Sequence, residues 1–324
     1  MSEGARCVAW LAIPILWSVA AGQGGPQGQV RVGAVTLHYW PGQRAAAEAL
    51  AAGLEQPVPM PGLPEDILAG GTITVYLAPD PQTFDSLAPG VPDWSGAIAF
   101  PEGDEIVLPV FSSRGGGVPL AVVLQHELAH VALSRYLGRR VPRWFHEGYA
   151  QLASGSWGSE DAWALRFAIL LGKLPSLEAI DLEFREGRVR ADHAYLLSHT
   201  AVEHLYRLGG KAGFARLLER WREVGELDLA MRRTYGLTQG QFERTWRREV
   251  GRRFGWLLVL TQTIVFWTML TIILLVLGYW KKRRTRRKLV ALEAAVAAAE
   301  ADALANAALD RGADLADEGV IDGP

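Results

Sequence analysis

Hydrophobic and polar positions alternate in the first part of the chain and follow a helical period in the second. The alternation predicts a strand over residues 29–37 and further strands over 72–77, 96–100 and 105–110. From Pro119 onward the apolar spacing is that of helices. Strands first and helices after them indicate an α+β fold rather than a parallel α/β sheet. The predicted helices cover residues 45–54, 82–88, 119–137, 143–154, 162–172, 194–208, 211–223 and 239–253.

An apolar run at residues 7–20 follows Arg6 and ends in the small residues Ala20 and Ala21. This run is too short to span a bilayer, and the small residues after it fit a cleavage site. The sequence therefore predicts a signal peptide over residues 1–21.

A longer apolar run extends from Trp256 to Trp280, with 25 residues and no charge. At about 1.5 Å rise per residue it is long enough to cross the hydrocarbon core, so it predicts a transmembrane helix. The basic stretch 281–288 follows, and such a cluster stays on the cytoplasmic side. We therefore expect a single-pass cell-membrane protein with an extracytoplasmic domain over 22–255. The alanine-rich and acidic tail, within 281–324, should be cytoplasmic.

The composition excludes several classes of protein and several kinds of metal site. With 49% hydrophobic and 21% charged residues, the 324-residue chain is neither a disordered polymer nor a polytopic membrane protein. A net charge of −2 gives no reason to expect nucleic acid as a partner. The chain has one cysteine, which excludes a disulfide scaffold and a cysteine-based zinc finger. Any metal site must therefore use histidine and carboxylate.

Such residues occur together in HELAH, residues 126–130. Two histidines four residues apart lie on the same face of a helix, so His126 and His130 can reach one ion. Glu127 points to the edge of that ion, where it can take a proton from a water molecule. Glu147, on a second predicted helix, is the natural source of a third ligand. Two histidines, one glutamate and an open position form the usual catalytic zinc arrangement.

HELAHVAL followed by PRWFHEGYAQLAS, residues 126–133 and 142–154, resembles the gluzincin metallopeptidases, and more narrowly the bacterial peptidase MA-like domains. The resemblance covers about residues 72–250. It implies a zincin-like, thermolysin-type fold, with a mixed sheet followed by a helical subdomain, and one Zn2+ per chain. It also implies that His126, His130 and Glu147 are the zinc ligands and that Glu127 is the general base and acid.

The resemblance extends to further positions around the predicted metal site. Tyr195 matches a tyrosine that hydrogen-bonds the developing oxyanion in related aminopeptidases, and His193 and His199 are alternatives for this role. Where thermolysin-type enzymes carry an acidic residue that orients a ligand histidine, this chain has Gln151, whose carbonyl can accept an imidazole N–H. His146 points about 100° away from Glu147 on an ideal helix and is not expected to be a ligand.

The stretch Gly96, Ala97 and Ile98 resembles the edge strand that runs along the cleft of such enzymes, and an exposed edge can bind an extended peptide. Together these features predict a membrane-anchored zinc metallopeptidase. Its expected partners are a peptide or protein substrate on the extracytoplasmic side and the lipid bilayer. The alternative is a catalytically silent zincin-fold ectodomain that acts as a binding or sensory module.

Overall fold

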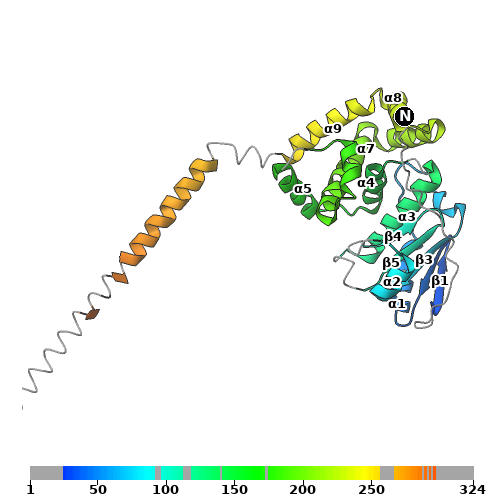
Figure 1. The fold of residues 1–324 in the computed structure, drawn as a ribbon, viewed down its shortest axis with the longest axis horizontal. Helices are drawn as coiled ribbons and strands as arrows, with labels where there is room; N and C mark the ends of the chain where they lie inside the picture. Colours follow the sequence, from blue (N-terminus) through cyan, green and yellow to red (C-terminus); the bar gives the residue numbers. More distant parts are fainter. Residues whose placement is uncertain are drawn as a thin grey trace, which may run out of the picture. The chain divides into compact units, whose positions relative to one another are not determined.

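The structure is a computed structural model that describes residues 25–91, 96–111, 118–138, 141–171, 174–255, 266–286, 288, 289, 292, 295 and 296. The described residues fall into two compact units, of which the first ends near residue 255 and holds the sheet and the labelled helices (Figure 1). The predicted signal peptide and residues 297–324 of the predicted tail lie outside the described residues.

Within the described residues, a mixed sheet is built from β1 (Gly28–Val32), β2 (Val35–Tyr39), β3 (Ile73–Ala78), β4 (Ile98–Phe100) and β5 (Glu105–Pro109). The strand order is β1-β2-β3-β5-β4. β2, β3 and β5 run parallel, whereas β1 with β2 and β4 with β5 form antiparallel pairs. β4 is therefore an edge strand, and one row of its backbone groups is left for other partners.

Helices cover both faces of the sheet. Successive side chains of a strand point to opposite faces, so each face presents its own apolar side chains to a helix. Val75 and Leu77 belong to a buried cluster with α1 (Arg44–Leu54) and α3 (Leu120–Leu137). Val107 packs on the other face with Phe84 of α2 (Pro81–Leu87). Helix α3, which carries His126 and His130, thus packs directly on the sheet (Figure 1).

Arg135 fixes α3 against the turn between β4 and β5. Its Nε and Nη2 donate to the two carboxylate oxygens of Asp104 at 3.0 and 2.8 Å, and its Nη1 donates to the backbone carbonyl of Leu68 at 2.7 Å. A bidentate arginine–carboxylate pair has a defined geometry. The contact therefore sets the position of α3 relative to the edge strand.

The helical subdomain centres on α4 (Arg143–Ser154), which packs against both α3 and α7 (Arg188–Val224). Gly148 allows the close approach of α4 to α7, because a Cβ at this position would lie 2.2 Å from the backbone oxygen of Ser198. Any larger residue there would push the two helices apart. The remaining helices are η1 (Ile67–Gly70), α5 (Ser159–Leu171), α6 (Leu177–Glu183), α8 (Leu227–Tyr235) and α9 (Gln239–Phe254).

The α+β fold class and the predicted strands 72–77 and 105–110 are confirmed, and α4 has the predicted bounds. The single strand predicted over 29–37 is wrong, because the chain turns at Gly33, whose φ of 55° suits a tight reversal, and returns as β2. The helices predicted over 194–208 and 211–223 are parts of α7, which is interrupted at Gly210. The short helices η1, α6 and α8 were not predicted.

In the second unit, residues 266–286 are helical and include the C-terminal part of the predicted membrane span. Residues 256–265 of that predicted span lie outside the described residues. Over the ranges that the structure describes, no helix has both the length and the apolar content required to cross a bilayer.

Candidate metal centre and active site

Helix α3 carries the two histidines of the predicted centre one turn apart. The rings of His126 and His130 meet edge to face, with 4.8 Å between their centroids. Glu147 of α4 approaches them, and ligand atoms of the three side chains all lie within 4.8 Å of one another. The structure thus brings the three predicted ligands together in a cluster that can hold a metal ion.

The contacts within this cluster have the spacing of a metal site. Oε2 of Glu147 lies 3.7 Å from Nε2 of His126 and 3.5 Å from Nε2 of His130. A tetrahedral Zn2+ with ligand distances of about 2.0–2.1 Å places its ligand atoms roughly 3.3–3.4 Å apart, so the donor set fits such an ion. Burial alone would raise the pKa of Glu147, but the two histidines outweigh it and hold the pKa well below its usual range. Glu147 is therefore an anion.

Hydrogen bonds at both ends of α4 set the position of Glu147. The carboxylate of Asp181 caps the N-terminus of α4, accepting from the backbone N–H groups of Arg143 at 3.3 Å and Trp144 at 2.6 Å. Near the other end, Nε2 of Gln125 in α3 donates to the carbonyl of Ala153 at 2.6 Å. Sequence reasoning missed Asp181, because no local pattern indicates that α6 would supply a cap to a helix 37 residues earlier in the chain.

Glu127 lies beside the cluster without belonging to it. Glu127 is 6% exposed, and its carboxylate accepts a hydrogen bond from the backbone N–H of Ala99 in the edge strand β4. Burial raises the pKa of Glu127, although His130 and His126 oppose the shift. A carboxylate whose proton affinity is raised by burial is better suited to accept a proton from a neutral donor.

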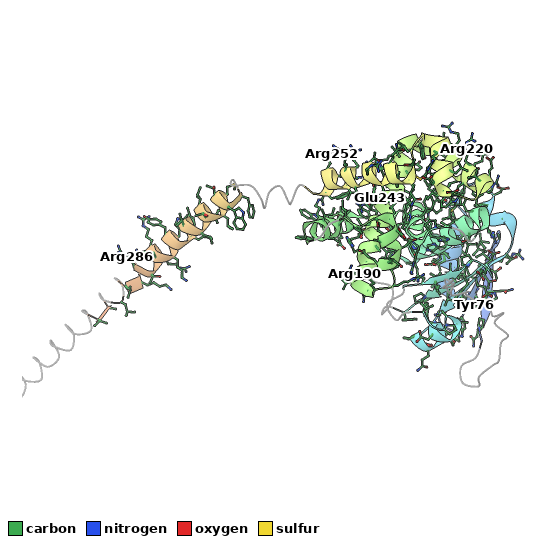
Figure 2. All side chains as sticks on the ribbon, turned by 45° about the horizontal axis from the view of Figure 1, so that its top comes forward. Tyr76, Arg190, Arg220, Glu243, Arg252 and Arg286 are labelled. Carbon is green, nitrogen blue, oxygen red and sulfur yellow. The ribbon has the colours of Figure 1, made fainter. Side chains whose placement is uncertain are left out.

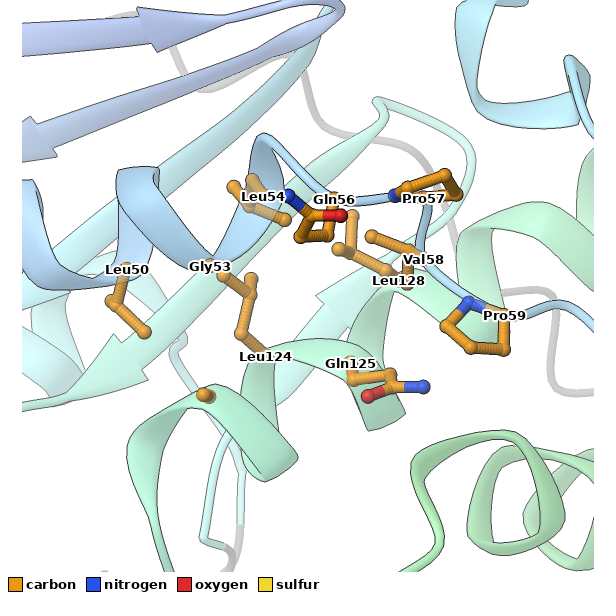
Figure 3. Close-up of a pocket in the computed structure, with 11 residues that line it drawn as sticks. Leu50, Gly53, Leu54, Gln56, Pro57, Val58, Pro59, Leu124, Gln125 and Leu128 are labelled. Carbon is orange, nitrogen blue, oxygen red and sulfur yellow. The ribbon is translucent and has the colours of Figure 1, made fainter.

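The cluster opens into a hollow of about 450 Å³. Ala97 and Ile98 line it, as predicted for the edge strand, whereas Gly96 is not among the lining residues. A smaller hollow of about 110 Å³ lies between α1, residues 56–59 and α3 (Figure 3). The described residues that line this second hollow include no titratable side chain, so the groups suited to acid–base or metal chemistry belong to the first.

The comparison with protein families agrees with this arrangement. Residues 69–251 match the sequence pattern of the Peptidase MA superfamily, and this span exceeds half of the chain. The chain belongs to the Peptidase MA superfamily. A comparison with curated proteins finds no match.

In this Peptidase MA domain, Tyr195 also faces the hollow. The negative charge of Glu147, together with burial, raises the pKa of Tyr195, so the phenol keeps its proton and remains a donor. Its hydroxyl hydrogen-bonds Arg143, whose Nε lies 3.6 Å from Oε1 of Glu147. The Arg143 guanidinium stacks over the ring of Phe184 at 4.5 Å. Sequence reasoning did not single out Arg143, although its i,i+4 spacing to Glu147 is a signal for an ion pair.

The two histidines considered as alternatives to Tyr195 do not line the hollow. Nδ1 of His193 pairs with Glu183 at 2.9 Å, and Glu183 also meets Arg190 at 3.7 Å (Arg190 is labelled in Figure 2). His199 is buried and stacks on Trp157 with 4.4 Å between ring centroids. Of the three residues considered for this role, Tyr195 is the one that lines the hollow.

The contact on the far side of His130 differs from the sequence prediction. Gln151 was expected to accept a hydrogen bond from a ligand histidine, but within the described part of the chain its side chain hydrogen-bonds neither His126 nor His130. Instead, Nδ1 of His146 lies 2.6 Å from Nδ1 of His130, and its Nε2 lies 3.1 Å from Oγ of Ser134. Burial, reinforced by the proximity of His130, lowers the pKa of His146 to about 3, so its ring is neutral. As predicted, His146 lies outside the ligand cluster.

Proposed function

We propose that this chain is a zinc-dependent metallopeptidase of the gluzincin type, which hydrolyses peptide bonds with an activated water molecule. The observation that carries the proposal is the convergence of His126, His130 and Glu147 on one point, with the buried carboxylate of Glu127 beside it. Two histidines and one carboxylate leave a tetrahedral ion one open position for water or substrate.

His126, His130 and Glu147 would hold a Zn2+ ion, which would supply a Lewis acid that lowers the pKa of water towards neutrality. The carboxylate of Glu127 accepts the proton of the attacking water, and it returns this proton to the leaving amine. Burial serves this role, because a carboxylate held away from bulk solvent has a higher proton affinity than an exposed one. The N–H of Ala99 keeps the carboxylate oriented.

The remaining groups of the hollow bind and polarise the peptide. β4 is an edge strand, and an extended substrate can add to it through main-chain hydrogen bonds, which gives affinity with little side-chain selectivity. The protonated phenol of Tyr195 donates a hydrogen bond to the oxygen that becomes negative in the transition state. Arg143 holds this phenol in place from the N-terminus of α4.

Metal removal tests the proposal. Purified protein should contain about one zinc ion per chain. Treatment with a chelator should abolish measurable peptide hydrolysis, because without the metal the water keeps its ordinary pKa and the peptide carbonyl is not polarised by a Lewis acid. Hydrolysis should return when one equivalent of Zn2+ is added. Mass spectrometry would measure both the metal content of the protein and the cleavage products. Hydrolysis that persists after complete removal of the metal would refute the metal-dependent mechanism.

We further propose that the apolar run Trp256–Trp280 anchors the peptidase domain in the cell membrane, with the domain on the extracytoplasmic side. The uncharged 25-residue stretch and the basic residues 281–288 that follow it support this proposal. A reporter enzyme fused after Pro324 should then be active only in its cytoplasmic form. Activity of a reporter that works only outside the cytoplasm would reverse the proposed orientation.

A further inference from the structure

Nδ1 of His130, a ligand in the proposed metal site, faces another histidine and not a carboxylate. His126, His130 and Ser134 are spaced by four residues along α3, so the three side chains lie on one face of the helix. The ring of His146 stacks against that of His130, with 4.7 Å between centroids and planes inclined by 24°. The two ring nitrogens of His146 thereby contact His130 and Ser134, which lie on successive turns of α3.

The positions of the protons in this contact follow from the geometry. Nε2 of His130 faces Glu147, so it is the atom that would bind the metal, and with the metal bound it would carry no proton. Nδ1 of His130 must then carry the proton, because a neutral imidazole has one N–H. Nδ1 of His146 lies 2.6 Å from Nδ1 of His130, so it can only accept the hydrogen bond from this N–H. The proton of His146 is therefore on Nε2, which donates to Oγ of Ser134 at 3.1 Å.

We propose that His146 and Ser134 are positioning residues for the metal site: they form a neutral hydrogen-bond chain that fixes the ring and tautomer of His130. This inference rests on the proposed metal site and extends it to residues outside the ligand set. Outer partners of ligand histidines raise the basicity of the ligand nitrogen and typically contribute about 10–100-fold to metal affinity.

Three side chains of similar shape at position 146 separate this role from simple packing. Oδ1 of asparagine is attached to Cγ, as is Nδ1 of histidine, so His146→Asn keeps an acceptor for His130. Leucine has the same branched shape as asparagine and no acceptor. His146→Leu should therefore bind Zn2+ about 10–100-fold more weakly than the wild type, whereas His146→Asn should stay within about threefold. Rescue by asparagine is not expected if the position only fills space.

Ser134 gives an independent arm of the same test. Ser134→Ala removes the acceptor that holds the His146 tautomer and should weaken Zn2+ binding, by less than His146→Leu does. In the His146→Asn background there is no Nε2 to hold, so the same Ser134→Ala change should have no further effect. Gln151→Ala is the control, because its side chain makes no hydrogen bond to the described histidines of the site, and its affinity should equal that of the wild type.

The measurement is the dissociation constant of Zn2+, obtained by competition with a chromophoric chelator on the full-length purified chain. Thermal melts of the metal-free proteins establish that each variant is folded. A wild-type chain that binds no zinc would overturn both this inference and the proposed function. Equal affinities for the wild type and His146→Leu, or an Asn variant as weak as Leu, would overturn the hydrogen-bond chain alone.

Discussion

Glu127→Gln should abolish measurable peptide hydrolysis while leaving zinc binding intact. Glutamine keeps the size of the side chain and can still accept the hydrogen bond from the N–H of Ala99. It cannot take a proton from water at neutral pH. Removal of a general base typically costs about 10²–10⁴-fold in rate, and the loss is larger when the same group also protonates the leaving amine. We expect kcat to fall by at least this factor, in an assay that follows cleavage of a fluorogenic peptide.

The control for this variant is a change that removes a different part of the mechanism. Tyr195→Phe deletes one hydroxyl donor and should lower kcat by about 10²-fold, with zinc content and KM little changed. Glu127→Gln should therefore be the more damaging of the two substitutions. Full activity of Glu127→Gln at wild-type zinc content would mean that another group takes the proton.

Glu147→Ala should lose the metal itself. The carboxylate supplies the anionic ligand, and without it the two imidazoles are the remaining ligands of the proposed site. Zinc that binds the folded state stabilises it by about 4 kcal/mol when its concentration is 1,000 times the dissociation constant. The wild type should therefore melt at a higher temperature in the presence of zinc, whereas Glu147→Ala should show neither the shift nor bound metal by elemental analysis.

The histidines provide the matched control. His126→Ala should behave like Glu147→Ala, because it removes one of the three converging donors. His193→Ala removes a histidine that pairs with Glu183 away from the hollow, so it should keep its zinc. Full zinc occupancy in a His126→Ala/Glu147→Ala double variant would contradict the ligand assignment.

The sequence predicts the clustering of His126, His130 and Glu147, because much of this geometry is local. Two histidines at i and i+4 share a helix face whatever the helix packs against, and the motif around Glu147 identifies the second helix. The bounds predicted for α4 agree with the structure. The prediction failed for residues 29–37, because β-branched and apolar residues stand on both sides of Gly33, and the shift in the phase of the alternation between Val32 and Val35 was not read as a turn.

Features that depend on the packing of two helices could not be read from the sequence. The expected direction of His146 followed from its angle on α4 alone, yet its partners His130 and Ser134 are on α3. How α3 meets α4 depends on distant contacts, such as the close approach of α4 to α7 at Gly148. The sequence therefore indicated that His146 lies outside the predicted ligand set but gave no sign of its contact with His130.

The most direct test of the proposed function is an unbiased peptide-library digestion by the zinc-loaded, full-length chain, with products identified by mass spectrometry. We expect discrete new termini that are absent from parallel digestions with the metal-free chain and with zinc-loaded Glu127→Gln. If the wild type holds one zinc ion and yields no more products than Glu127→Gln, the domain is a binding or sensory module and not a peptidase.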